Sequence, residues 1–246
     1  MKNLIKYILI ILVTTIPALS YSQDTIFIDP TFLGTSDGTI TNPYKGWRDF
    51  SWTGYEVFLQ KRGTQWVGGT ISPVGDNVTM GAYGVGPKPK IICNTEQIIY
   101  SVKAINCYQG DGITIKDLDL SALYDISCII YPSADNNPII IDSCLIHDAS
   151  WGIRVFSTEA DVIVRNCEIY NTGNDGFYSE NTKDMYFYNN NIHHVNDEDG
   201  GGDCIQIAGE QRNIYIYNNI LDHSTHGNKF CSIFGSAYIT RDSTPD

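Results

Sequence analysis

The chain has 246 residues and a formal net charge of −12, from 16 basic and 28 acidic side chains. A chain of this length can form one domain with a substantial core. Its acidic surface would repel phosphate backbones, which argues against nucleic acid as a partner. The same surface would repel an acidic glycan unless a cation or a local basic patch intervenes.

The first 22 residues are typical of a signal peptide. A basic start precedes an apolar run over residues 8–16, and the small residues Ser20 and Ser22 suit cleavage before Gln23. Because the run is too short for a bilayer core of about 30 Å, no membrane span is expected, and a retained anchor is the less favoured alternative. The protein is therefore predicted to be secreted, periplasmic or at the cell surface.

Five segments of eight residues recur along the chain from residue 113 onward. Each begins with alternating inward apolar and outward residues, continues with a polar residue and ends with a second inward-facing pair. The segments are Ile113–Leu120, Ile139–Ile146, Val162–Ile169, Met185–Ile192 and Ile214–Leu221. Their starts lie 26, 23, 23 and 29 residues apart, which predicts stacked structural repeats.

The polar residue in the middle of each repeat predicts a sharp bend between two strands. It is Asp117, Ser143, Asn166, Asn189 or Asn218. Asn in particular tolerates a left-handed backbone and bonds its own main chain. A third strand is expected after a variable loop, at Gly152–Phe156, Gly176–Glu180, Cys204–Ala208 and Phe230–Phe234.

Three strands per coil, with coils about 4.8 Å apart, predict an all-β, right-handed, single-stranded parallel β-helix. The alternative is an antiparallel sandwich, which would need tight two-residue hairpin loops between adjacent strands. The repeated register favours the β-helix. Residues 23–246 are expected to form this domain, with an irregular N-terminal cap and the first coils in residues 23–100 and regular coils in residues 101–246.

The C-terminal end of the pattern is abrupt, because the chain stops at Asp246 about one strand after the last recognisable coil. Two alternatives remain open: the chain is truncated, or a short last coil closes the helix. An open end would expose unpaired strand edges. A monomer is expected.

Seven cysteines stand at wide spacings without a C-x-x-C pair, so a zinc site is not indicated. Secretion would permit disulfides. Most of the cysteines lie in apolar strand patterns, however, which favours buried thiols. They are Cys93, Cys107, Cys128, Cys144, Cys167, Cys204 and Cys231.

The order of strands and turns resembles that of the pectate-lyase superfamily. In the strand order of that superfamily, the segments GIRVF, GFYSE and CIQIA, described above as third strands, are the first strand of each coil. The second strand is VIVRN, MYFYN or IYIYN, and an Asn-bearing short turn and a third strand follow before a variable loop. The resemblance covers most of the chain after residue 22. It implies sites on the outer face of the first strand and in the loop before it, and polysaccharide lyases as the commonest members. Fold alone does not define function.

The longest loop before a first strand, residues 195–203, is rich in carboxylates. Long loops on a regular scaffold tend to be functional. Aligning the first strands stacks Asp203 one coil above Asp175, and stacked carboxylates repel each other unless a cation neutralises them. Asp175, Asp203, Asp197 and Asp199 are therefore predicted ligands of Ca²⁺.

The same alignment continues the column from Trp151 through the two carboxylates to Lys229 on the next coil. A lysine beside a cation can lose its proton and remove the C5 proton of a uronate. His194 and His223, which align with each other, are further candidate bases. The alternatives are a surface ion pair between Lys229 and Asp203 and a structural or solvated role for the histidines.

Candidate substrate-binding residues face outward from the first strands: Arg154, Tyr178 and Gln206. Arginine suits bidentate binding of carboxylates. Tyr186 and Tyr188 should stack under Tyr215 and Tyr217 on another face, where stabilising the sheet is favoured over stacking on sugars.

The leading prediction is a secreted polysaccharide lyase that cleaves a pectate- or alginate-like acidic polysaccharide by calcium-assisted β-elimination. A glycoside hydrolase on the same scaffold is the second hypothesis, although tight Asp-Asp and Gly-His-Gly signatures are absent. The third is a non-catalytic carbohydrate-binding or surface protein.

Overall fold

The computed structural model describes residues 25–52, 56–94, 103–107, 112–122, 128–132, 138–156, 161–195, 202–222 and 231–234. The predicted signal peptide, Asp197, Asp199, His223 and Lys229 lie outside these ranges. Among the described residues there is no helix, and hence none long and apolar enough to cross a membrane.

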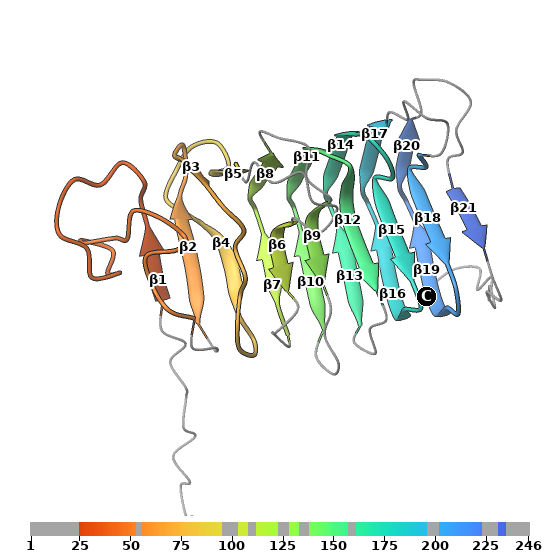
Figure 1. Cartoon of the computed structure of the whole chain (residues 1–246), viewed down its shortest axis with the longest axis horizontal. Coiled ribbons are helices and arrows are strands. Elements are labelled where there is room, and N and C mark those ends of the chain that lie inside the picture. Colours follow the sequence, from red (N-terminus) through yellow and green to blue (C-terminus); the bar gives the residue numbers. More distant parts are fainter. Residues whose placement is uncertain are drawn as a thin grey trace, which may run out of the picture.

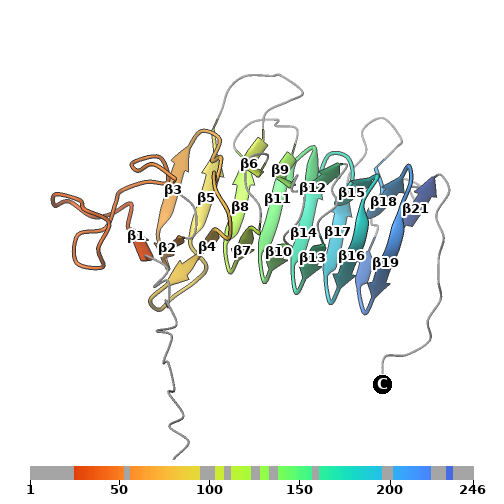
Figure 2. The same cartoon turned by 90° about the horizontal axis from the view of Figure 1, so that it is seen from below.

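Three parallel sheets run along the long axis of the molecule, with their strands stacked side by side (Figures 1 and 2). Sheet A contains β1 (Thr25–Ile28), β2 (Val57–Lys61), β4 (Thr79–Tyr83), β7 (Thr114–Lys116), β10 (Ile139–Asp142), β13 (Val162–Arg165), β16 (Lys183–Tyr188) and β19 (Arg212–Tyr217). Sheet B contains β3 (Gln65–Gly68), β5 (Lys90–Cys93), β8 (Asp119–Ala122), β11 (Leu145–Ala149), β14 (Glu168–Thr172), β17 (Asn191–Val195) and β20 (Ile220–Asp222). Sheet C contains β6 (Lys103–Cys107), β9 (Cys128–Pro132), β12 (Trp151–Phe156), β15 (Phe177–Glu180), β18 (Ile205–Ala208) and β21 (Cys231–Phe234).

Each regular coil contributes one strand to sheet C, then one to sheet A, then one to sheet B. Strands of successive coils pair in parallel, and the register matches the repeat alignment: Ile139 lies opposite Val162, and Val162 lies opposite Met185. The predicted single-stranded parallel β-helix with three strands per coil is thereby confirmed.

The connections between a sheet A strand and the following sheet B strand, called corners below, contain the predicted polar residues. Their φ angles lie between +54° and +60°, at Asp117, Ser143, Asn166, Asn189 and Asn218. Asn and Asp adopt this left-handed conformation more readily than other non-glycine residues, which explains their place in the repeat.

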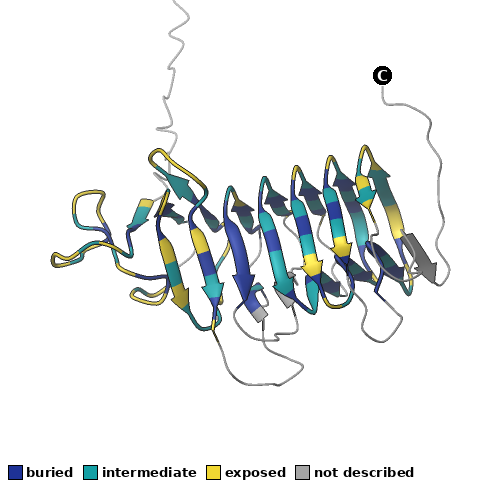
Figure 3. Cartoon of the chain, turned by 90° about the horizontal axis from the view of Figure 1, so that it is seen from above, coloured by how far each residue is buried: buried dark blue, intermediate teal, exposed yellow. Residues whose placement is uncertain are grey.

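The core fills the inside of the coils, because alternate side chains of every strand point inward. Ile141, Val164 and Phe187 lie opposite one another in β10, β13 and β16 and are fully buried. Figure 3 shows buried positions alternating with more exposed ones along the strands. Burying each such side chain stabilises the fold by roughly 1.5–3 kcal/mol.

Five of the cysteines are buried and are not in disulfides: Cys93, Cys107, Cys144, Cys167 and Cys204. The prediction of buried thiols is confirmed for these five, whereas the side chains of Cys128 and Cys231 lie outside the described part of the structure. The inner column that holds Cys144 and Cys167 continues with Asn190, whose Nδ2 donates to the carbonyl of Val164 at 3.0 Å.

The N-terminal end has an aromatic cluster instead of regular coils. Trp47 is fully buried and its Nε1 donates to Gln60 Oε1 at 2.6 Å. Trp52 packs beside Trp47 and Phe58, so apolar rings cover this end of the core.

Candidate functional site

An acidic pair occupies the start of neighbouring strands in sheet C. Because β12, β15 and β18 pair in register, Trp151, Asp175 and Asp203 lie one coil apart, as the sequence alignment predicts. Trp151 Nε1 donates to Asp175 Oδ2 at 3.1 Å, and the backbone N–H of Asp203 donates to Asp175 Oδ1 at 2.8 Å. Both carboxyl oxygens of Asp175 therefore accept hydrogen bonds.

Glycines allow the coils to approach each other at this point. A Cβ added to Gly152 would lie 2.5 Å from the carbonyl oxygen of Gly176, and one added to Gly176 would lie 2.9 Å from that of Cys204. Only residues without a side chain fit such contacts. At the same place the backbone N–H of Gly176 donates to the carbonyl of Asp203 at 3.0 Å, so the two coils are joined beside the acidic pair.

Asp175 is a carboxyl group removed from solvent, with 1% of its surface exposed. Burial raises its pKa to about 6, and the negative charge of Asp203 acts in the same direction. The two hydrogen bonds and the positive charge of Arg154 oppose this rise. A fraction of Asp175 is consequently protonated near neutral pH.

Arg154 lies beside this pair on the outer face of sheet C, held by aromatic rings. Its Cζ is 4.4 Å from the ring centroids of Trp151 and Phe156 and 5.3 Å from that of Tyr178. Its buried Nε has no hydrogen-bond partner among the described residues. The guanidinium is thus positioned by cation–π contacts with three aromatic rings.

The predicted substrate-binding residues form one outward column, since Arg154 lies opposite Tyr178 and Tyr178 opposite Gln206. The hydroxyl of Tyr178 donates to Glu180 Oε2 at 2.8 Å. Burial, and then this carboxylate, raise the pKa of Tyr178 to about 12, so the phenol stays neutral as a donor.

The described histidine candidate, His194, lies on sheet B, whereas the acidic pair lies at the start of strands in sheet C. His194 belongs to β17 in sheet B, has a left-handed φ of +51°, and its Nδ1 lies 2.6 Å from Nδ1 of His193. His193 lies opposite Asp222, as the alignment predicts. The catalytic roles of His194, His223 and Lys229 stay predictions.

The calcium site likewise stays a prediction. Within the described residues, no three His, Cys, Asp or Glu side chains lie close enough together to hold a metal ion. The pair Asp175 and Asp203 is assembled, but Asp197 and Asp199, which would complete the ligand set, lie outside the described ranges.

Three residues that shape this surface are not among the predicted site residues: Trp151, which is a hydrogen-bond donor, and Phe156 and Glu180, which neighbour the outward column. Strand alternation carries a signal for the latter two. Phe156 and Glu180 are two positions after Arg154 and Tyr178, and therefore share their face.

A family model described as "Right handed beta helix region" matches residues 95–242. The match spans more than half of the chain, so the protein belongs to the right-handed β-helix family. No curated protein sequence matches the chain.

Two solved structures share the architecture: the selenomethionine derivative and the native form of GH136 lacto-N-biosidase from Eubacterium ramulus. Their TM-scores are 0.53 and 0.50, each at 11% identity, over 86% and 87% of this chain. This chain spans 55% of the first structure and 67% of the second. At such identity, the likeness establishes a common fold.

Proposed function

We propose that the protein is an extracellular glycan-cleaving enzyme that hydrolyses a glycosidic bond on the outer face of sheet C, with Asp175 as the general acid. The observation that supports this proposal is the acidic pair, in which burial and a neighbouring carboxylate raise the pKa of Asp175 to about 6. A carboxyl group that keeps its proton near working pH can protonate a leaving oxygen.

The neighbouring residues suit the other parts of such a reaction. Asp203 lies one coil away and supplies the second carboxylate that glycoside hydrolysis requires. Trp151 and Tyr178 offer aromatic surface to sugar rings, and Gln206 offers an amide to hydroxyl groups. The same fold is used by the GH136 lacto-N-biosidase, which supports a hydrolase on this scaffold.

A uronate lyase is the second candidate, and Arg154 is the observation that favours it. Its guanidinium lies on the outer face of sheet C beside the acidic pair, and a guanidinium suits the carboxylate of a uronic acid. In this reaction Lys229 would remove the C5 proton, and calcium held by Asp175, Asp203, Asp197 and Asp199 would neutralise the substrate carboxylate.

One assay separates the two reactions. The protein is incubated with neutral oligosaccharides and with polyuronates, with and without Ca²⁺, while new reducing ends and the ultraviolet absorbance of a C4–C5 double bond are followed. Hydrolysis produces reducing ends without the absorbance. An increase in the absorbance would show that the reaction is β-elimination and not hydrolysis. The absence of both signals on all substrates would contradict both proposed functions.

Asp175→Asn tests the residue assignment. We expect kcat to fall by about 10²- to 10⁴-fold, because the amide cannot donate a proton to the leaving group. The control is Asp184→Asn on sheet A, where φ of +47° suits Asn equally well and activity should not change. Wild-type activity in Asp175→Asn would refute the role of this carboxyl group.

A further inference from the structure

The corners between sheets A and B differ in length along the molecule. In the regular coils two residues separate the strands, as between Asp142 and Leu145. In the first two coils, three residues separate β2 from β3 and six residues, numbers 84–89, separate β4 from β5. Gly84 and Gly86, with φ of +80° and +129°, allow the wider path of the longer corner.

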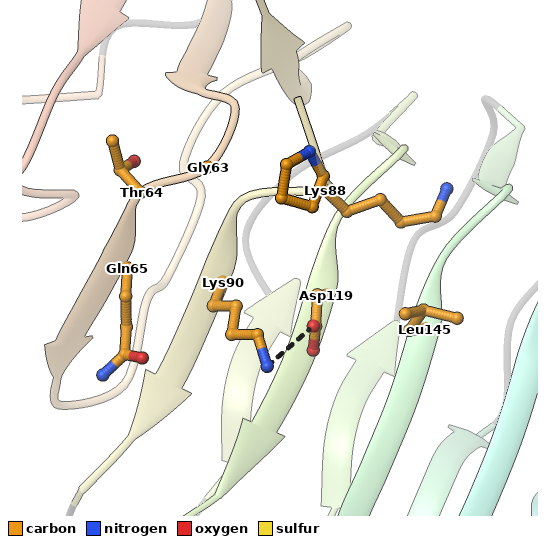
Figure 4. Close-up of a pocket in the computed structure, with 8 residues that line it drawn as sticks. Gly63, Thr64, Gln65, Lys88, Lys90, Asp119 and Leu145 are labelled. Carbon is orange, nitrogen blue, oxygen red and sulfur yellow. Dashed lines mark ion pairs between the residues drawn. The ribbon is translucent and has the colours of Figure 1, made fainter. Parts of the chain in front are cut away.

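A cavity of about 300 Å³ lies next to these long corners, at the start of the sheet B strands. Gln65, Lys90, Asp119 and Leu145 line it from four neighbouring strands, and Figure 4 shows Lys90 and Asp119 facing each other. Pro87, from the six-residue corner, also lines the cavity. This site is separate from the acidic pair, which lies on sheet C.

Asp119 provides a fixed hydrogen-bond acceptor in the cavity although only 6% of its surface is exposed. Its Oδ1 lies 2.9 Å from Nε2 of His147, and its Oδ2 lies 3.4 Å from Nζ of Lys90. Burial by itself would raise the pKa of Asp119, but His147 and Lys90 hold it below its usual value. The carboxylate is therefore ionised at neutral pH and held in one orientation.

Ammonium groups provide the complementary donors. Lys90 has about half of its side chain exposed, and its long contact to Asp119 leaves N–H groups for a ligand. Lys88, which also lines the cavity, is fixed by Asp117 Oδ1 at 3.0 Å and the carbonyl of Ser143 at 2.7 Å. The carboxylate of Asp119 and the ammonium of Lys90 thus stand side by side in a cavity that Pro87 and Leu145 also line.

This combination matches the chemistry of a sugar. One hydroxyl of a vicinal diol can donate to a carboxylate while its oxygen and that of the next hydroxyl accept from an ammonium group and an amide. The C–H surface of the ring can cover the apolar wall. An anion would meet the charge of Asp119, and an apolar ligand would cover the ammonium of Lys90 without giving it a hydrogen bond in place of water.

We propose that the cavity formed by β3, β5, β8 and β11 is a second carbohydrate-binding site, which takes one neutral hexopyranose-sized unit through a vicinal diol held by Asp119 and Lys90. Its volume is at the lower end of the range for ligand pockets and suits a single sugar ring. The site would hold a glycan without taking part in its cleavage, because it shares no residue with the pair Asp175 and Asp203.

The test uses the whole chain and saturation-transfer NMR with methyl glycosides of neutral hexoses, of N-acetylhexosamines and of hexuronic acids. We expect neutral glycosides to bind. Asp119→Asn and Lys90→Met should each raise Kd by about tenfold or more, because each removes a charged hydrogen-bonding partner. Lys90→Met leaves the contact between Asp119 and His147 in place, so it reports binding even if Asp119→Asn folds poorly.

Two controls separate this site from the catalytic one. Lys116→Met removes an exposed lysine on sheet A, and Asp175→Asn removes the proposed acid. Both should leave Kd unchanged. The inference is overturned if no neutral glycoside binds, if Lys90→Met binds like the wild type, if uronic acids bind more tightly than neutral sugars, or if Asp175→Asn is the variant that abolishes binding.

Discussion

Asp175 is subject to two opposing influences. Burial favours its neutral form, while hydrogen bonds from Trp151 and from the backbone of Asp203 favour the carboxylate. Burial has the larger effect, and the pKa rises from 3.8 to about 6. A residue that served only to fix the main chain of Asp203 would need no such desolvation, which is why we connect the raised pKa with proton donation.

This shift has a consequence for stability that does not depend on substrate. Between about pH 4 and pH 6 the folded protein keeps a proton on Asp175 that the unfolded chain has released. The free energy of unfolding therefore falls as pH rises through this window, by up to about 3 kcal/mol for a shift of roughly two pH units. Below this range Asp175 is protonated in both states, so its contribution is fully present there.

Asp175→Asn removes this titration. Urea unfolding followed by tryptophan fluorescence at pH 4 and pH 7 should show a smaller decrease in stability for the variant than for the wild type. Asp184→Asn, on sheet A, should follow the wild type at both pH values. An identical pH dependence in wild type and Asp175→Asn would mean that the folded-state pKa of Asp175 is close to 3.8.

At the scale of single elements, the strands of sheet C depend on small residues where coils approach most closely. A methyl group on Gly176 would lie 2.7 Å from Cγ2 of Ile192 and 2.9 Å from the carbonyl oxygen of Cys204. Both neighbours belong to packed strands or their ends and cannot move freely. A side chain at this position would therefore press on the strands that carry Asp175 and Asp203.

We expect Gly176→Ala to destabilise the protein by about 1–3 kcal/mol, the usual cost of overpacking. Gly173→Ala is the matched control in the same connection, since its nearest contact would be an ordinary 3.9 Å. It should be neutral or slightly stabilising, because it reduces the freedom of the unfolded chain. Thermal unfolding of both variants checks the prediction, and equal melting temperatures would contradict it.

At the scale of the whole molecule, the sequence predicts the fold well because each coil repeats the same physical problem. Alternating residues such as Val162 and Val164 must face the core, and Asn166 must supply a left-handed bend, so the register can be aligned by eye. The column of Trp151, Asp175 and Asp203 follows from that register alone.

Side-chain detail is harder to predict. The aromatic contacts of Arg154 depend on rotamers, and the burial of Asp175 depends on how closely neighbouring coils pack. His147 contacts Asp119 on the preceding coil, but the residue directly opposite Asp119 is Leu145, two positions earlier in β11. The contact therefore depends on the rotamers of both side chains. The cavity on sheet B depends on long corners that break the repeat, which a search for regularity ignores.

Packing of the whole molecule also determines how its thiols react. Five of the seven cysteines are buried without a disulfide, and burial raises the pKa of the Cys144 thiol well above its ordinary value. Because thiolates at the surface are the reactive species, these five thiols should react with a disulfide reagent only as fast as the coils separate. We expect at most two thiols per chain to react rapidly in buffer and the remaining five to follow the unfolding rate as urea is increased. The readout is the time course of released chromophore, and rapid reaction of more than two thiols without urea would show that the coils open locally in the native state.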